Sequence, residues 1–102
     1  MANYRDSDAW KRAMELVCEI YRATVGFPDE EMFGLAAQMR TASVRVTSRI
    51  AEGSNAEAFA ALLELETEVI VAARLEYLPR AAGQRLYKLI RKLKPAVAVF
   101  AE

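Results

Sequence analysis

Apolar residues recur at every third or fourth position along four segments of the chain, which is the spacing of one face of an α-helix. These segments cover residues 8–24, 33–52, 56–76 and 80–100. The alternation of apolar and polar residues that is typical of a strand does not occur. The pattern predicts an all-α protein whose four helices form a single domain over residues 1–102.

Glycine and proline residues mark the expected ends of these helices. Gly26 and Pro28 follow the first segment, Gly53 closes the second, and Pro79 opens the fourth. Pro95 lacks an amide hydrogen and clashes with the preceding turn, so it should kink the fourth helix or end it just before that position. With connections this short, an antiparallel up-and-down four-helix bundle is the expected architecture.

Two of the segments carry more apolar surface than the core of a bundle needs. The first has a main stripe, made of Trp10, Ala13, Met14, Val17 and Tyr21, and a smaller set made of Ala9, Leu16 and Ile20. The third has one face with Phe59, Leu62, Leu63, Ile70, Ala73 and Tyr77, and another with Ala61, Leu65, Ala72 and Leu75. Because a small monomer rarely exposes a large apolar patch, we expect these two helices to join copies in a homo-oligomer. The alternative is a compact monomer with a fully buried third helix.

Net charge is zero, so no overall field draws the protein to nucleic acid or to an anionic membrane. The charge is uneven, however, because residues 80–101 hold six basic residues and no acidic ones. Arg85, Lys88 and Lys92 fall on one face of the fourth helix, with Arg91 beside them. This stripe is a candidate nucleic-acid site, since aligned cations can contact successive phosphates. Alternatively, the cations interact with the negative C-terminal end of the helix dipole, or they pair with acidic residues within or between subunits.

The residue inventory argues against an enzyme. The chain has no histidine, so it lacks the base of a Ser-His-Asp or Cys-His arrangement. Cys18, the single cysteine, has no partners for a zinc site and is expected to be a buried small hydrophobe rather than a reactive thiol. A glycine-rich phosphate loop is also missing from the sequence. We therefore expect no catalytic residue, metal or cofactor.

The expected location is the cytoplasm. A single cysteine fits a reducing compartment. Residues 1–10 lack the apolar core of a signal peptide. No apolar run approaches the length of about 20 residues that crosses a bilayer, so no membrane association is expected.

Several polar residues inside the apolar pattern form a candidate internal network. Glu66 falls in the angular sector of one apolar stripe of the third helix, at or near the core, where a carboxylate needs a partner. A donor could come from the second helix. We expect a structural network made of Gln38, Arg40, Glu52 and Glu66. The alternative is a weak metal or ligand site that includes the neighbouring glutamates at positions 64 and 68.

Four short blocks, in order along the chain, resemble a known family. They are YRDxxxWxxA in residues 4–13, FPxxExFGL in residues 27–35, QMRxASV and IAEGS in residues 38–54, and LET, ARL and YL in residues 65–78. Together they resemble the bacterial four-helix-bundle family first noticed as proteins encoded by intervening sequences in 23S ribosomal RNA genes.

The resemblance implies a left-handed bundle that assembles into a ring, typically a homopentamer around a central pore. The family includes accessory proteins of diversity-generating retroelements, which are strongly basic pentamers that bind a reverse transcriptase and nucleic acid. No enzymatic activity is attached to the fold in general. We therefore expect a non-enzymatic structural or adaptor protein that binds a protein partner, with a nucleic-acid-binding accessory factor as the alternative. The chain departs from the family in its neutral charge and at Asn55, where members usually carry a longer basic stretch.

Overall fold

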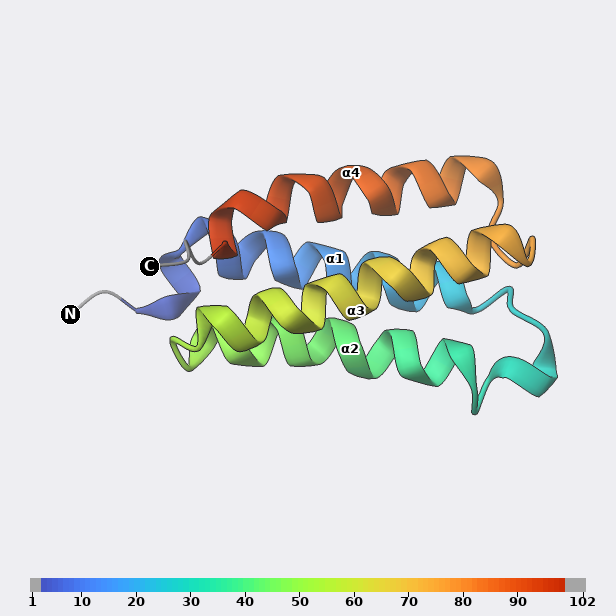
Figure 1. Cartoon of the computed structure of the whole chain (residues 1–102), viewed down its shortest axis with the longest axis horizontal. Helices are drawn as coiled ribbons and strands as arrows, with labels where there is room; N and C mark the ends of the chain where they lie inside the picture. The colour runs from blue at the N-terminus through green and yellow to red at the C-terminus, as the bar shows by residue number, and fades with distance from the viewer. Residues whose placement is uncertain (1–2, 99–102) are drawn as a thin grey trace.

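The computed structural model describes residues 3–98, which form four α-helices joined by short connections (Figure 1). The helices are α1 (Asp8–Thr24), α2 (Leu35–Ala51), α3 (Asn55–Arg74) and α4 (Arg80–Val97). Two 3-10 turns, η1 (Tyr4–Asp6) and η2 (Asp29–Glu31), precede α1 and α2. Consecutive helices run in opposite directions along a body of 44 × 25 × 22 Å. The prediction of an all-α four-helix bundle is confirmed.

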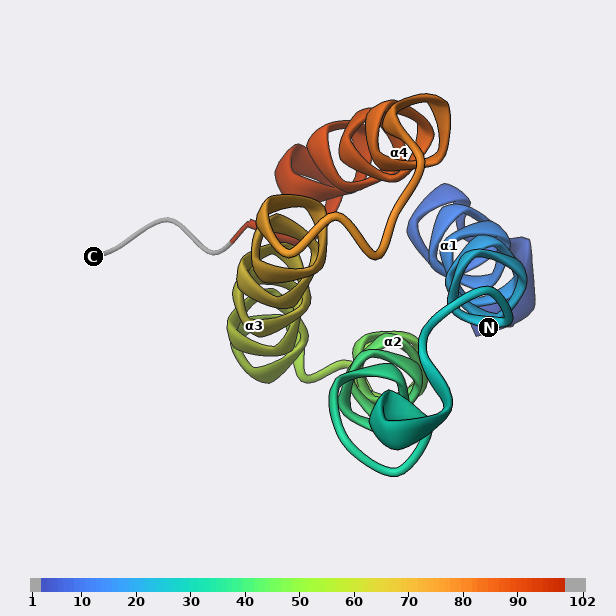
Figure 2. The same ribbon diagram turned by 90° about the vertical axis from the view of Figure 1, so that its right-hand side faces the viewer.

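The helices follow one another around the bundle axis (Figure 2). Each helix packs against its neighbours in the chain, and α1 also packs against α4. As a result, α1 and α3 lie on opposite sides of the bundle, and so do α2 and α4. This order decides which surfaces of the protein face in different directions.

The core lies along the bundle axis and receives one row of apolar side chains from each helix. Spacings of three and four keep such a row on one side of a helix, so each helix buries a stripe and leaves its other side to solvent. The largest fully buried apolar side chains are Leu16, Ile20, Met39, Val46, Leu62, Leu65, Val69, Leu86, Ile90, Leu93 and Val97. Phe27 and Leu78, from the two connections at one end, are buried as well.

The main apolar stripe of α1 is not the one that fills the core. The buried residues of α1 are Ala13, Leu16, Ile20 and Thr24, so the core takes most of the smaller set. Trp10 and Tyr21 each carry a polar group that stays satisfied at the surface, whereas leucine and isoleucine lose nothing when they are buried. The residues of α3 that face the core are Ala58, Ala61, Leu62, Leu65, Glu68, Val69 and Ala72. Phe59, Leu63 and Ile70, from the first of the two predicted faces, lie outside this set.

Local hydrogen bonds set the ends of the helices. The Ser7 hydroxyl accepts a hydrogen bond from the Trp10 amide at 3.1 Å, which caps the first turn of α1. After α2, Gly53 adopts a φ of 78°, a left-handed conformation that lets the amides beyond the helix reach back to its last carbonyls. Glu76 takes the same conformation after α3, with a φ of 63°, although it has a side chain.

Several predicted boundaries differ from the structure, and two of them, the end of α2 at Ala51 and the start of α3 at Asn55, differ by a single residue. α2 begins at Leu35 rather than at 33, because η2 and Gly34 come first. α3 ends at Arg74 rather than at 76, because Glu76 leaves the helical conformation. α4 continues through Pro95 to Val97, since the proline lies in the last turn, where few backbone hydrogen bonds remain to be lost. The predicted end of this helix at residue 100 lies outside the described residues.

Candidate interaction surfaces

An apolar groove separates α1 from α2 on the outside of the bundle, and we call it the α1–α2 groove. Its volume is about 340 Å³, and it is lined by Tyr4, Trp10, Met14, Val17, Val44, Thr47, Ser48 and Ala51. The Tyr4 and Trp10 rings meet edge-on with 5.5 Å between their centroids. Met14 is 38% exposed and Val44 is 43% exposed. Most of the main stripe of α1 therefore lies in or beside a surface groove.

The outward side of α3 is a second apolar surface, which we call the α3 face. Leu63 and Val71 are exposed there, while Phe59 and Ile70 are half-buried. Leu63 follows Phe59 by one helical turn, and Ile70 follows Leu63 by two, so the three residues share one side of the helix. Because α1 and α3 lie on opposite sides of the bundle, the α3 face and the α1–α2 groove point in different directions (Figure 2).

The sequence as a whole identifies the family to which this bundle is related. Residues 5–98 match the model of the 23S rRNA-intervening sequence protein family. The chain belongs to this family. No curated protein matches the chain. The matched residues include all four helices, and therefore the α3 face and nearly the whole α1–α2 groove.

A buried carboxyl group lies between α2 and α3 of this intervening-sequence family member. Glu68 is 8% exposed, and its Oε1 has no hydrogen-bond partner within the described residues. Burial, reinforced by the carboxylate of Glu64 one turn earlier, raises the pKa of Glu68 from 4.5 to about 7. Arg45 acts in the opposite direction but bonds directly to Glu64, with 2.9 Å between Nη1 and Oε1. Glu68 is thus a neutral or half-ionised acid near neutral pH.

Glu66, which the sequence placed at or near the core, is partly exposed instead. Its Oε2 lies 2.8 Å from Nζ of Lys94, so its partner is on α4 and not on α2. The expected donors, Gln38 and Arg40, lie elsewhere. The angular sector that contains Glu66 faces α4, whereas the core of α3 is centred nearer Leu65 and Val69.

The other members of the expected polar network also have separate partners. Arg40 bonds to α1, with 2.8 Å between its Nε and the hydroxyl of Thr24, and its guanidinium lies 4.8 Å from the centre of the Tyr21 ring. Glu52 pairs with Arg49 at 3.0 Å, within the end of α2. Gln38 is exposed. Within residues 3–98, Arg40 and Glu66 each link a different pair of helices, Glu52 pairs locally, and the four residues do not meet as one network.

The basic residues of α4 divide into paired and unpaired cations. Arg85 lies 3.8 Å from Glu19 of α1, so it belongs partly to an interhelical contact. Lys88, Arg91 and Lys92 are exposed and form no salt bridge with any residue of the described chain. These three cations project into solvent, as a phosphate-binding stripe requires.

Two residues have positions that the sequence did not indicate. Cys18 is exposed on α1 rather than buried, because the core row of this helix runs through Leu16 and Ile20. Phe33, in the connection between η2 and α2, is 98% exposed. Helical periodicity gives no signal for a residue outside a helix, so only the structure shows that Phe33 projects into solvent.

The described residues were also compared with what a membrane-spanning helix or a metal site requires. No helix among them has the length and apolar content to span a bilayer. Within the same residues, His, Cys, Asp and Glu side chains do not gather in groups of three or more that could hold a metal ion. The candidate interaction surfaces of the described chain are the α1–α2 groove, the α3 face, Phe33 and the cations of α4.

Proposed function

We propose that this protein is a non-enzymatic scaffold that assembles with copies of itself and serves as a structural or adaptor protein for a protein partner. The observation that supports the proposal is the pair of apolar surfaces on different sides of one small bundle. Exposed side chains of this kind release free energy when they are covered, at roughly 25 cal/mol for each Å² of apolar area. The missing histidine is in keeping with a role that does not depend on acid–base catalysis.

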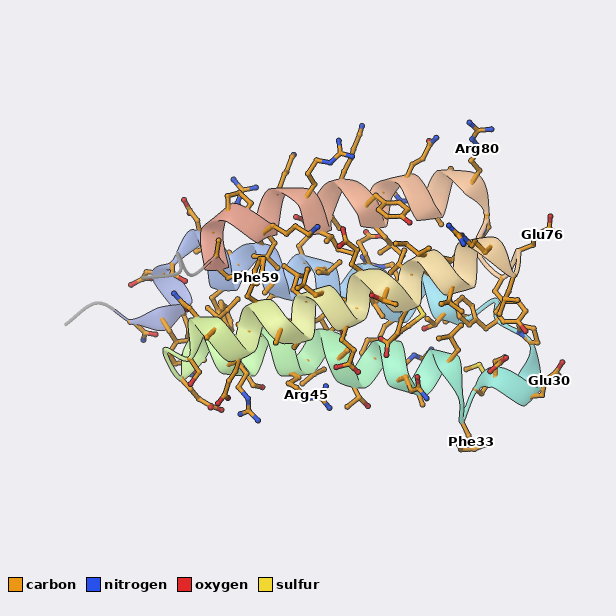
Figure 3. All side chains as sticks on the ribbon, viewed as in Figure 1. Glu30, Phe33, Arg45, Phe59, Glu76 and Arg80 are labelled. Atoms are coloured by element: carbon orange, nitrogen blue, oxygen red, sulfur yellow. The ribbon has the colours of Figure 1, made fainter. Side chains whose placement is uncertain are left out.

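The geometry favours a ring over a symmetric dimer. A twofold dimer pairs one surface with itself, whereas two different surfaces that complement each other make a head-to-tail contact. Such a contact closes into a ring when the rotation between successive copies adds up to a full turn. The α1–α2 groove lies where α1 begins and α2 ends, and Phe59 of the α3 face lies at the same end of the bundle (Figure 3). One copy's α3 face can therefore meet the next copy's groove without a shift along the axis. We take five as the ring size from the family resemblance.

Light scattering after size-exclusion chromatography tests this assembly. We expect a mass several times 11.4 kDa at micromolar concentration. Leu63→Glu puts a charge in the α3 face and should reduce the mass towards that of one chain. Glu15→Lys, an exposed substitution on α1 outside the groove, should leave the mass unchanged. A wild-type mass near 11.4 kDa would refute the proposal.

A second candidate function is nucleic-acid binding through α4, supported by the three exposed and unpaired cations. Repeated around a ring, they would make a band of positive potential that contacts phosphates. Labelled RNA or DNA should shift in a gel at low salt, and the triple variant Lys88→Glu/Arg91→Glu/Lys92→Glu should abolish the shift. Lys11→Glu, on the exposed side of α1, is the control that should retain it. No shift of the wild type at low salt would exclude this function.

A further inference from the structure

Phe33 is a fully exposed aromatic side chain on a fixed connection. The Glu31 carboxylate holds this connection from both sides: Oε1 accepts the amide of Leu35 at 3.2 Å, and Oε2 accepts the hydroxyl of Tyr77 at 3.1 Å. The amide of Gly34 also bonds to the Glu31 carbonyl at 3.0 Å. Phe33 is therefore presented to solvent by a hydrogen-bonded turn. An exposed, pre-organised aromatic residue is the kind of group that anchors protein interfaces.

A groove at the α3–α4 connection lies at the same end of the bundle as Phe33, and we call it the α3–α4 groove. Its volume is about 470 Å³, and its apolar and small residues are Ala73, Leu78, Pro79, Gly83 and Tyr87. Arg80 and Glu76 line it too. Figure 3 shows Phe33 below α2 and Arg80 above the start of α4, on opposite sides of this end of the bundle. A copy therefore cannot place its own Phe33 in its own groove, whereas the neighbouring copy can.

Unpaired charges around the two features are complementary. Asp29 and Glu30, in the turn before Phe33, are exposed acids, and Figure 3 shows Glu30 at this end of the bundle. On the other side, Arg80 lines the α3–α4 groove, and the exposed bases Arg74 and Lys88 directly follow lining residues in the chain. None of these five residues forms a salt bridge within the described chain. The groove also contains one acidic residue, Glu76, but the basic residues around it are more numerous.

We propose that Phe33 of one copy inserts into the α3–α4 groove of the next copy, with Asp29 and Glu30 facing the basic residues around it. This inference rests on the proposed self-association and names a contact within it. The contact joins the α2 side of one bundle to the α3–α4 side of its neighbour, which is also the direction in which the α3 face meets the α1–α2 groove. The two contacts lie at opposite ends of the bundle, so together they fix the angle between neighbours.

Disulfide cross-linking tests the contact in the full chain. Cys18→Ser removes the exposed native thiol, and Phe33→Cys with Gln84→Cys places one thiol on each side of the proposed contact. Oxidation with copper–phenanthroline should give a ladder of covalent multimers on a non-reducing gel. The matched pair Phe33→Cys with Glu15→Cys, whose second thiol lies on α1, should give no ladder beyond the single-cysteine background.

Dissociation on dilution provides the second measurement. Phe33→Ser removes the aromatic ring from an exposed site, so the helix content should stay unchanged by circular dichroism while the midpoint of dissociation rises at least tenfold. If the wild type is monomeric, the proposed self-association fails and this contact fails with it. If the wild type is oligomeric but shows no ladder, or if Phe33→Ser dissociates at the wild-type concentration, only the Phe33 contact is overturned.

Discussion

Replacing Glu68 by glutamine should remove a pH dependence from the stability of the bundle. The carboxyl group is 8% exposed at the boundary between α2 and α3, and its pKa is raised to about 7 by burial and by Glu64. In the unfolded chain the same group has its ordinary pKa of 4.5. Glutamine has a similar shape and stays neutral, so the variant imitates the protonated form of Glu68 at every pH.

The sign follows from the number of protons bound in each state. Between pH 4.5 and 7 the folded protein retains a proton that the unfolded chain releases, so the free energy of unfolding falls as the pH rises. Below this window both states are protonated, and above it both are ionised. The difference between 4.5 and about 7, at about 1.4 kcal/mol for each pH unit, sets an upper limit of about 3–4 kcal/mol for the loss.

Urea unfolding followed by circular dichroism at pH 5, 6, 7 and 8 measures the effect, with the protein concentration held constant because association adds to apparent stability. Glu68→Gln should differ little from the wild type at pH 5, exceed it increasingly up to about pH 7, and keep a nearly constant advantage from there to pH 8. The control is Glu66→Gln, two residues away, whose carboxylate pairs with Lys94 outside the core. A difference between Glu68→Gln and the wild type that stays constant across this range would refute the reasoning.

Three further substitutions test the helix ends and the α1–α2 contact. Glu76→Gly should raise the free energy of unfolding by about 0.5–1 kcal/mol, because glycine adopts the left-handed conformation at little cost, whereas Glu76→Ala should not. Ser7→Ala should lose about 1 kcal/mol of stability in thermal unfolding as the cap of α1 disappears, and Ser7→Asp should retain it. Arg40→Ala should lower the free energy of unfolding in urea by about 1–2 kcal/mol, because it removes both the hydrogen bond to Thr24 and the stacking on Tyr21. If Arg40→Lys restored the full stability, the contribution of the stacking would be contradicted.

Helical periodicity predicted the four helices because it reports which residues can share a face. The bounds of α1 agree with the prediction at both ends, since Ser7 is a favourable cap and the helix stops shortly before Gly26. Periodicity does not report which of two apolar faces turns inward. In α1 the row with Leu16 and Ile20 is buried and most of the row with Trp10 and Met14 is not, a choice that depends on the packing of the other helices.

The candidate surfaces were less accessible to prediction than the helices. The sequence indicated surplus apolar residues on the first and third helices, and the structure places Met14 and Leu63 at the surface. The sequence did not indicate that Glu68 is the buried carboxyl group. Glu66 and Glu68 lie about half a turn apart, so the choice between them depends on the exact rotation of α3 about its axis. Phe33 lies outside any periodic pattern, so its exposure follows only from the turn around it.

The connection between α2 and α3 has a consequence for the order in which the chain folds. Residues 52–54 alone join the two helices, and ion pairs from Arg49 to Glu57 and from Arg45 to Glu64 link them further along. Contacts between residues close in sequence cost little chain entropy to form, so the α2–α3 hairpin is the expected nucleus of folding. α1 would join it only after residues 25–34 close a longer loop. A strained left-handed residue in place of Gly53 should therefore slow refolding more than it speeds unfolding.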